Sequence, residues 1–253
     1  MVICNMHPTI LHEDSTLYSA DFPGAARTWL KENILGDECV VLYHTGPAGN
    51  QSPRHITMSN TFEEVERLGT VLGKAIKKAI LSADRVPNHK ISVASASVDL
   101  IPRSFASEAV AREELARIWA RFQRLKADGA ASQKVRTAEC DWFGAEESVA
   151  LAMAQSDGRL EGARRGTMPA EIQLIRIGPL NFVGWPCEIF VEYGLELKRK
   201  SSNSYVISLA NGEAQGYIVT PEAEQRGGYE ASNGLFAADS GSILVRETLR
   251  LMG

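Results

Sequence analysis

The sequence predicts an α/β fold, a mixed β-sheet flanked by helices in a single domain. Two observations support this prediction. Short apolar, β-branched segments alternate along the chain with stretches of helical period, and no repeat or low-complexity linker separates them. The chain also has 253 residues, of which 44% are hydrophobic, so it is long enough to bury a substantial core.

The first half of the chain shows three strand signals and one strong helix signal. The apolar run "VIC" and residues 39–43 both precede polar loops, and the second is predicted to be a buried strand. Thr61 and Glu64 form a capping box that begins a helix with one apolar face over residues 62–79. Ile91 and Val93 alternate with smaller residues, which predicts a strand with one buried face.

The second half alternates helices and strands. Helices are expected over residues 108–127 and 145–156, with a mobile loop over residues 126–137. A pair of apolar strands follows, interrupted at Gly178 and Pro179. Further elements are a helix over residues 189–199 opened by Glu188, strands in "YVISLANG" and "GYIVT", and a closing helix over residues 240–252.

Composition excludes several classes of protein. Lys and Arg number 27 against 31 Asp and Glu, for a net charge of −4, which argues against nucleic acid as a partner. The four cysteines form no CxxC pair and are expected to be reduced, buried thiols. No apolar stretch approaches the ~18 residues of a transmembrane segment. Without a signal peptide, the chain as written is expected to be cytoplasmic; a secreted or periplasmic protein is the alternative if the natural chain starts upstream.

Four residues stand out as candidates for chemistry: His7 in "HPT", Ser52 in "GPAGNQSP", Glu188 in "GWPCE" and Tyr229 in "GGYE". Each follows a strand or lies in a loop, where α/β proteins collect functional groups. Each also has an ordinary structural explanation, such as a turn, a helix start or a packed loop. The stretch from Met6 to Gly24, which also holds His12, Glu13, Asp14 and Asp21, is therefore either a polar surface loop or the source of a metal-binding histidine.

Taken together, these segments resemble the neutral/alkaline (non-lysosomal) ceramidase family. The matching stretches are "HPTIL…SADFPG", "GPAGNQSP", "GWPCEIFVEYGLELKRK" and "LANGEAQGYIVTPEAEQRGGYEASNGLF", in the family's order from residue 6 to about residue 237. The resemblance implies that residues 1–253 are a partial ceramidase-like domain, apparently half of a larger catalytic domain. It lacks the upstream "HxHSGP" segment that carries another zinc ligand in the family.

The resemblance implies a zinc site held by His7, Glu188 and Tyr229. One imidazole, one carboxylate and one phenol oxygen suit zinc, which would activate water to hydrolyse an N-acyl amide such as ceramide. Ser52 would contact the scissile amide. Gly46, Gly49 and Asn50 would form a substrate loop whose backbone could donate hydrogen bonds to an oxyanion.

Other interpretations stay open. The chain could be a non-catalytic remnant, a binding protein or a partner subunit of the same fold, or a globular protein without metal. A metal-free serine hydrolase is disfavoured because Pro53 removes a backbone N–H that a nucleophile elbow needs. If half of a domain is missing, an uncovered sheet edge predicts a homo-oligomer or an upstream partner half, and the isolated chain is expected to be a poor enzyme.

Overall fold

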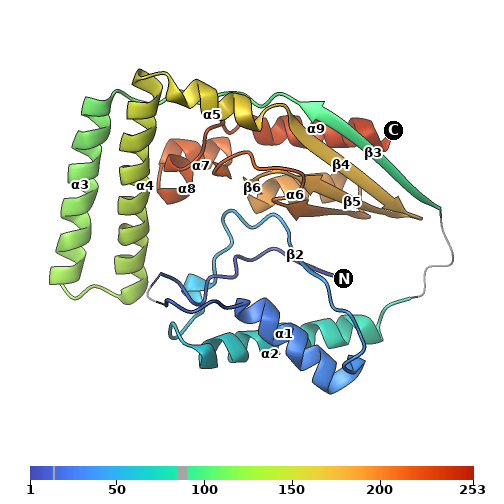
Figure 1. Ribbon diagram of the computed structural model, residues 1–253. Coiled ribbons are helices and arrows are strands. Elements are labelled where there is room, and N and C mark those ends of the chain that lie inside the picture. Colours follow the sequence, from blue (N-terminus) through green and yellow to red (C-terminus); the bar gives the residue numbers. More distant parts are fainter. Residues whose placement is uncertain (14, 85–89) are drawn as a thin grey trace.

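The computed structural model describes residues 1–13, 15–84 and 90–253 and confirms the predicted mixed α/β fold. Its main sheet has the order β3 (Ile91–Val98), β4 (Ala170–Ile177), β5 (Leu180–Trp185) and β7 (Ser204–Ser208). The first three strands are antiparallel, and β7 pairs parallel to β5. The predicted strand pair around Gly178 and Pro179 is therefore the β4–β5 hairpin (Figure 1).

Helices α6 (Val191–Lys200) and α9 (Ser240–Met252) cover one face of this sheet and enclose the main core. Ile172, Leu174 and Val183 face inward at 0–1% exposure, and Leu244 of α9 packs against the same core. The indole N–H of Trp185 donates to the hydroxyl of Thr248 at 2.9 Å, so the polar edge of a fully buried Trp has a partner. The closing helix has the bounds that its periodicity predicts.

A smaller layer lies below the sheet in Figure 1 and belongs to the first third of the chain. It consists of α1 (Asp21–Leu30), the short η1 (Lys31–Leu35) and α2 (Phe62–Leu81), beside the parallel pair β1 (Val2–Cys4) and β2 (Tyr43–Thr45). We call this layer the N-terminal lobe. Its own core is small, with Ile10, Phe22 and Val65 buried at its centre.

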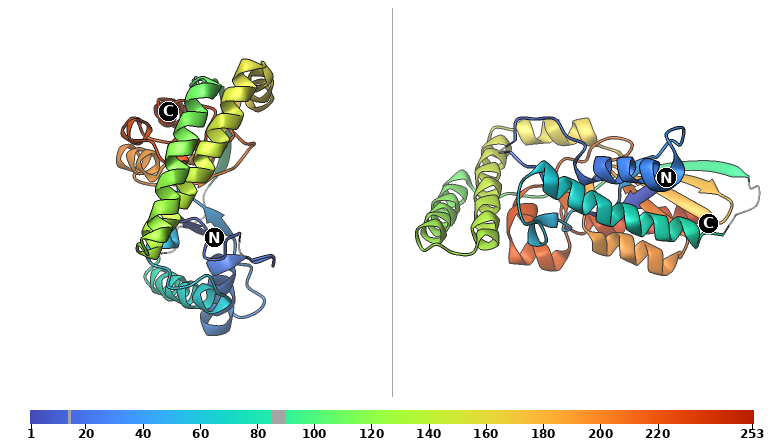
Figure 2. Two further views of the ribbon diagram at one scale, coloured as in Figure 1. Left: turned by 90° about the vertical axis from the view of Figure 1, so that its left-hand side faces the viewer. Right: turned by 90° about the horizontal axis from the view of Figure 1, so that it is seen from below.

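An antiparallel helix pair, α3 (Glu108–Ala127) and α4 (Ser132–Ser156), stands at one end of the molecule, and α5 (Arg159–Thr167) leads back to the sheet (Figure 2). Two short helices, α7 (Pro221–Arg226) and α8 (Tyr229–Ser232), lie between this pair and the sheet. The smallest elements are η2 (Pro53–His55), β6 (Glu188–Ile189) and β8 (Tyr217–Ile218).

The structure corrects four local expectations. Residues 39–43 are not a buried strand, since β2 begins only at Tyr43 and Val40 is 79% exposed. In β3 the less exposed face carries Ala94, Ala96 and Val98, whereas Ile91 and Val93 lie on the opposite face and are exposed. Residues 132–137 belong to α4 rather than to a loop. Glu188 lies in β6 and not in a helix, which starts at Val191.

Other sequence predictions concern bonds and surfaces. Cys4, Cys39, Cys140 and Cys187 are all free thiols, but only Cys187 is buried, which corrects the expected burial of the other three. The Thr61 hydroxyl caps α2 by accepting from the Glu64 N–H, but the Glu64 carboxylate turns to Met58 and Arg67 instead of closing a reciprocal capping box. Among the described residues, no helix is long and apolar enough to cross a bilayer. Asp14, which was discussed above, lies outside the described part of the chain.

Candidate functional site

The site begins where the N-terminal lobe meets the main sheet. His7 follows β1, and its backbone N–H donates to the Gln51 carbonyl at 2.9 Å. This bond ties the "HPT" segment to the loop that carries Ser52. The sequence alone places these segments about 45 residues apart, and the parallel β1–β2 pair brings them to the same edge.

Tyr217 links the predicted metal ligands. The parallel pairing of β6 with β8 sets Glu188 opposite Tyr217, and the Tyr217 hydroxyl forms a hydrogen bond with the Glu188 carboxylate. The Tyr217 ring meets the His7 ring edge-on at 6.2 Å between centroids and the Tyr229 ring at 5.8 Å. The structure therefore places His7, Glu188 and Tyr229 around one tyrosine. Sequence reasoning missed Tyr217, because "GYIVT" was interpreted only as a strand.

Two tyrosine pKa values report the charge inside this cluster. Burial, followed by the negative charge of Glu188, raises the pKa of Tyr217 well above its usual range. Burial and Glu188 also raise the pKa of Tyr229. Both phenols are accordingly neutral donors when only protein surrounds them.

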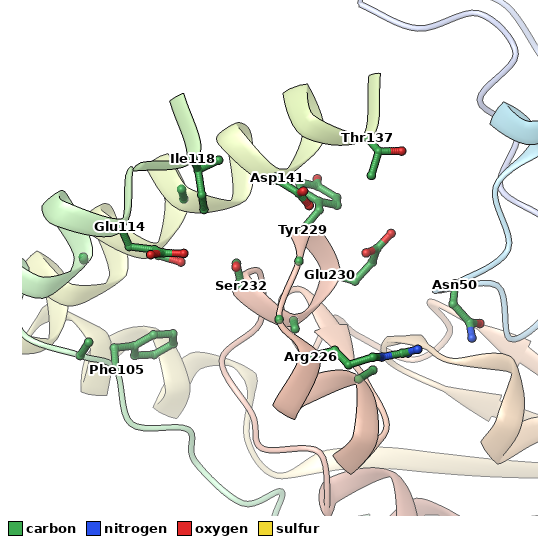
Figure 3. Close-up of a pocket in the computed structure, with 18 of the residues that line it drawn as sticks. Asn50, Phe105, Glu114, Ile118, Thr137, Asp141, Arg226, Tyr229, Glu230 and Ser232 are labelled. Carbon is green, nitrogen blue, oxygen red and sulfur yellow. The ribbon is translucent and has the colours of Figure 1, made fainter. Parts of the chain in front are cut away.

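Tyr229 is positioned by the short α8 helix. Gly227 and Gly228 precede it with φ values of 73° and 104°, a conformation that favours glycine. On the other side, a Cβ at Gly144 of α4 would lie 3.1 Å from the Tyr229 Cα, so the two helices touch closely. Figure 3 shows Tyr229 and Glu230 between the α4 helix, which carries Asp141, and the loop of Asn50.

Two cavities open on this cluster. The smaller, of about 550 Å³, is lined by His7, Ser52, Tyr217 and Tyr229, among others. The larger, of about 1040 Å³, shares Ser52, Arg54, Tyr229 and Glu230 with it and extends between α3, α4 and α7. Glu188 lines neither cavity, because Tyr217 stands in front of it.

Ser52 lies at the junction of the two cavities. It caps η2, and its hydroxyl oxygen accepts from the Arg54 N–H at 3.3 Å and from the Arg54 side chain at 3.4 Å. The Arg54 guanidinium also pairs with Glu230 at 3.4 Å. The turn interpretation of Ser52 is correct for the backbone, and the same geometry presents the hydroxyl to both cavities.

Two backbone N–H groups of the "GPAGN" loop are engaged within the fold. The N–H of Gly46 donates to the Cys4 carbonyl at 3.0 Å, and the N–H of Gly49 donates to the Ile189 carbonyl at 2.9 Å. The Asn50 side chain accepts from the Val191 N–H at 3.0 Å and donates to Glu192. In this structure the loop joins the lobe to α6. The N–H groups of Gly46 and Gly49 are therefore not free to bind an oxyanion, which corrects the expectation for these two positions.

The polar stretch after His7 divides into two parts. His12 and Glu13 line the smaller cavity, where Arg136 pairs with Glu13 and lowers the pKa of its carboxyl to about 2. Asp21 is buried instead, and one carboxylate oxygen accepts from the N–H groups of Ile10 and Leu11 at 3.0 Å each. The first part forms a rim of the cavity, and the second part fixes the fold of the loop.

One observation bears on a metal. The His7 Nε2 atom is buried and has no hydrogen-bond partner among the described residues. A buried polar atom without a partner is costly, and a metal ion is one way to satisfy it. Within the described residues, no group of three or more His, Cys, Asp and Glu side chains is placed so that it could hold a metal ion. Any site built here therefore depends on the tyrosine as a third ligand.

Comparison with solved structures now gives the fold a reference. A crystal structure of neutral ceramidase from Pseudomonas aeruginosa matches with a TM-score of 0.65 and 18% identity, over 98% of this chain and 42% of that chain. A structure described as ceramidase complexed with C2 matches with a TM-score of 0.64 and 15% identity, over 98% of this chain and 44% of that chain. The chain has part of the neutral ceramidase fold.

This ceramidase likeness covers the fold and leaves the chemistry to be argued from the residues. The chain spans less than half the length of the matched ceramidase structures. No protein-family model and no curated protein sequence matches it. The likeness extends across the whole cluster from His7 to Tyr229, while the zinc ion, the role of Ser52 and the homo-oligomer stay predictions.

Proposed function

We propose that this chain is a zinc-dependent hydrolase of ceramidase type that cleaves an N-acyl amide bond. The observation that carries the proposal is the buried Nε2 of His7, which has no partner and borders a cavity shared with Tyr229 and Ser52. His7, Glu188 and Tyr229 would hold the zinc ion, a ligand set that the chemistry of zinc accepts. Bound zinc supplies Lewis acidity, which polarises an amide carbonyl and lowers the pKa of water toward ~7.

The remaining steps belong to the protein side chains. The Ser52 hydroxyl accepts two hydrogen bonds from Arg54 and keeps its own proton for an amide substrate. The adjacent guanidinium favours negative charge developing at that oxygen. In the overall reaction, water adds a hydroxyl to the acyl carbon and a proton to the nitrogen as the C–N bond breaks, giving a carboxylic acid and an amine.

The geometry also favours a second candidate, a binding protein that holds an amide without cleaving it. Glu188 is engaged by Tyr217 and lines neither cavity, so the Glu188 side chain must turn before it can reach a metal ion. The N–H groups of Gly46 and Gly49 are engaged as well. Because reacting groups must be held to within ~0.5 Å, hydrolysis by this chain alone is expected to be slow.

Metal content tests the proposal directly. The wild-type protein, loaded with zinc and dialysed, should retain about one zinc ion per chain, since three protein ligands suffice for a catalytic zinc. His7→Ala should abolish retention, whereas His55→Ala, an exposed histidine at the edge of the larger cavity, should not. Elemental analysis that finds no zinc in the wild type would contradict the proposal. If the wild type retains zinc but does not hydrolyse a short N-acyl amine, and Ser52→Ala behaves in the same way, the binding protein would be favoured.

A further inference from the structure

The larger cavity has an uneven charge balance. Its lining includes five arginines (Arg54, Arg103, Arg117, Arg121 and Arg226) but only three carboxylates (Glu114, Asp141 and Glu230). Each carboxylate forms an ion pair with one arginine: Glu230 with Arg54, Glu114 with Arg117 and Asp141 with Arg121. Two lining arginines are therefore left without a lining carboxylate, in a protein whose net charge is −4.

The excess resides on Arg103 and Arg226. Among the described residues, neither has a carboxylate oxygen within 4.0 Å of its guanidinium. Arg103 is half-buried with its guanidinium 5.0 Å from the centre of the Phe105 ring, and Glu224 acts on it only from a greater distance. Glu222 is the carboxylate that feels the charge of Arg226, again without an ion pair.

Such arginines are suited to bind an anion. Burial of the Arg103 guanidinium is unfavourable without a counter-charge, and burial lowers its pKa. A planar guanidinium held over an aromatic ring presents its edge N–H groups, which match the two oxygens of a carboxylate or a sulfonate. A cavity with walls of one charge sign also concentrates ligands of the opposite sign.

The cavity also joins this charge to the reacting centre and to an apolar wall. Ser52 and Tyr229 line both cavities, so a ligand whose amide lies at Ser52 can extend into the larger one. Phe105, Ile118 and Phe190 provide apolar surface along the way. In Figure 3, Phe105 and Ile118 lie on the far side of α8 from Asn50, and Arg226 points toward Asn50.

We propose that the substrate is an anionic N-acyl amine: an aliphatic amide that carries a carboxylate, or a comparable compact anion, bound by Arg103 and Arg226. This inference rests on the proposed amidase function for the position of the amide, but the anion site is made by other residues. It can therefore be tested by binding alone, whether or not the chain hydrolyses the ligand.

The test compares four probes by calorimetry on the full chain. N-hexanoylglycine carries a carboxylate, N-hexanoyltaurine a sulfonate, N-hexanoylethanolamine no charge, and sodium sulfate supplies an anion without an acyl chain. We expect both anionic amides to bind about 10-fold or more tightly than the neutral amide, as a charge-assisted hydrogen bond predicts. Sulfate should bind weakly and compete with N-hexanoylglycine.

Variants assign the effect to the two arginines. Arg226→Gln changes an exposed side chain, so folding is not at risk. It should weaken the binding of N-hexanoylglycine about 10-fold and leave the affinity for the neutral amide unchanged. Arg103→Gln should do the same, and Arg103→Lys should restore part of the affinity. Arg199→Gln, an exposed arginine of α6 outside the cavity, is the matched control.

Two outcomes would overturn this inference. Equal affinity for the neutral and anionic amides would show that the cavity does not select charge. Selective binding of the anion that survives both Arg103→Gln and Arg226→Gln would place the anion site elsewhere. A protein that retains no zinc but still binds N-hexanoylglycine through these arginines would contradict the hydrolase proposal and support the anion site.

Discussion

At the scale of single residues, Tyr217 holds the cluster together: its hydroxyl is bonded to the Glu188 carboxylate, and its ring meets the rings of His7 and Tyr229. His7, Ser52 and Tyr229 were singled out from loop motifs, and the structure places all three on one cavity. Glu188 was found too, but its partner Tyr217 was not, because a tyrosine at the start of an apolar strand has no local signal of function. The two unpaired arginines were also missed, since pairing depends on which carboxylates the fold brings near.

Glu64 permits a residue-scale prediction about pH. It is 3% exposed, and the Arg67 guanidinium, helped by the Met58 N–H, holds the pKa of its carboxyl at about 2 instead of 4.5. Because the pKa is lower in the folded state, its contribution to stability is complete above pH 4.5 and disappears as the pH falls toward 2. Glu64→Gln should therefore lower the free energy of unfolding by about 1–3 kcal/mol at pH 7, and by progressively less below pH 4.5.

Urea unfolding of the wild type and the variant at pH 7 and pH 3.5 measures this difference. Glu66→Gln is the control, since Glu66 is an exposed neighbour on the same helix and should change stability by less than about 0.5 kcal/mol. A difference between wild type and Glu64→Gln that stays constant with pH would contradict the assignment.

At the scale of elements, strong local signals gave accurate bounds. Both α3 and α9 occupy the predicted residues, since a cap or a clear apolar stripe marks each helix. The start of α4 was predicted to be a loop because residues 132–137 are polar and small, and only packing against α3 and α8 makes them helical. Residues 39–43 failed for the opposite reason: their apolar pattern predicts burial, but Val41 is buried while its neighbours Val40 and Leu42 are exposed, and the strand begins only at Tyr43.

The crossing of α1 and α2 supplies the element-scale prediction. A Cβ at Gly69 of α2 would lie 2.4 Å from the Cβ of Ala25 and 2.9 Å from the Ala26 N atom, so the two helices cross at backbone contact. Gly69→Ala should destabilise the protein by about 1–3 kcal/mol despite the better helix propensity of alanine. Gly162→Ala in α5, where a Cβ meets nothing within 4 Å, should instead stabilise it by up to about 1 kcal/mol.

Thermal and urea unfolding of the two alanine variants would decide the point. Their opposite signs separate the steric effect at the crossing from helix propensity, which is common to both. If both variants were stabilised, α1 and α2 would not be in backbone contact in solution.

At the scale of the whole molecule, the site lies across two parts of unequal size. His7 and Ser52 come from the N-terminal lobe, while Glu188, Tyr217 and Tyr229 come from the main sheet and its helices. The lobe has only a small buried core, whereas the sheet, α6 and α9 share a large one. Long-range pairing of this kind has no signature in a local sequence pattern, which is why motifs could point to the proposed ligands but not to their arrangement.

Asn50 gives this arrangement a test, because its side chain bonds the lobe to α6 at both Val191 and Glu192. Asn50→Ala should loosen the junction without unfolding the main core. In hydrogen exchange, the amides of α1 and α2 should already exchange faster than those of β4 and β5 in the wild type, since a small core opens at lower free energy. The variant should widen that gap, and zinc retention should weaken about 10-fold because ligands from both parts must meet.

Asn33→Ala is the control. The Asn33 side chain donates to the Trp29 carbonyl within the lobe, so this variant should leave the junction intact. Faster exchange spread evenly over both parts, or unchanged zinc retention in a variant with a loosened lobe, would contradict a site assembled across this junction.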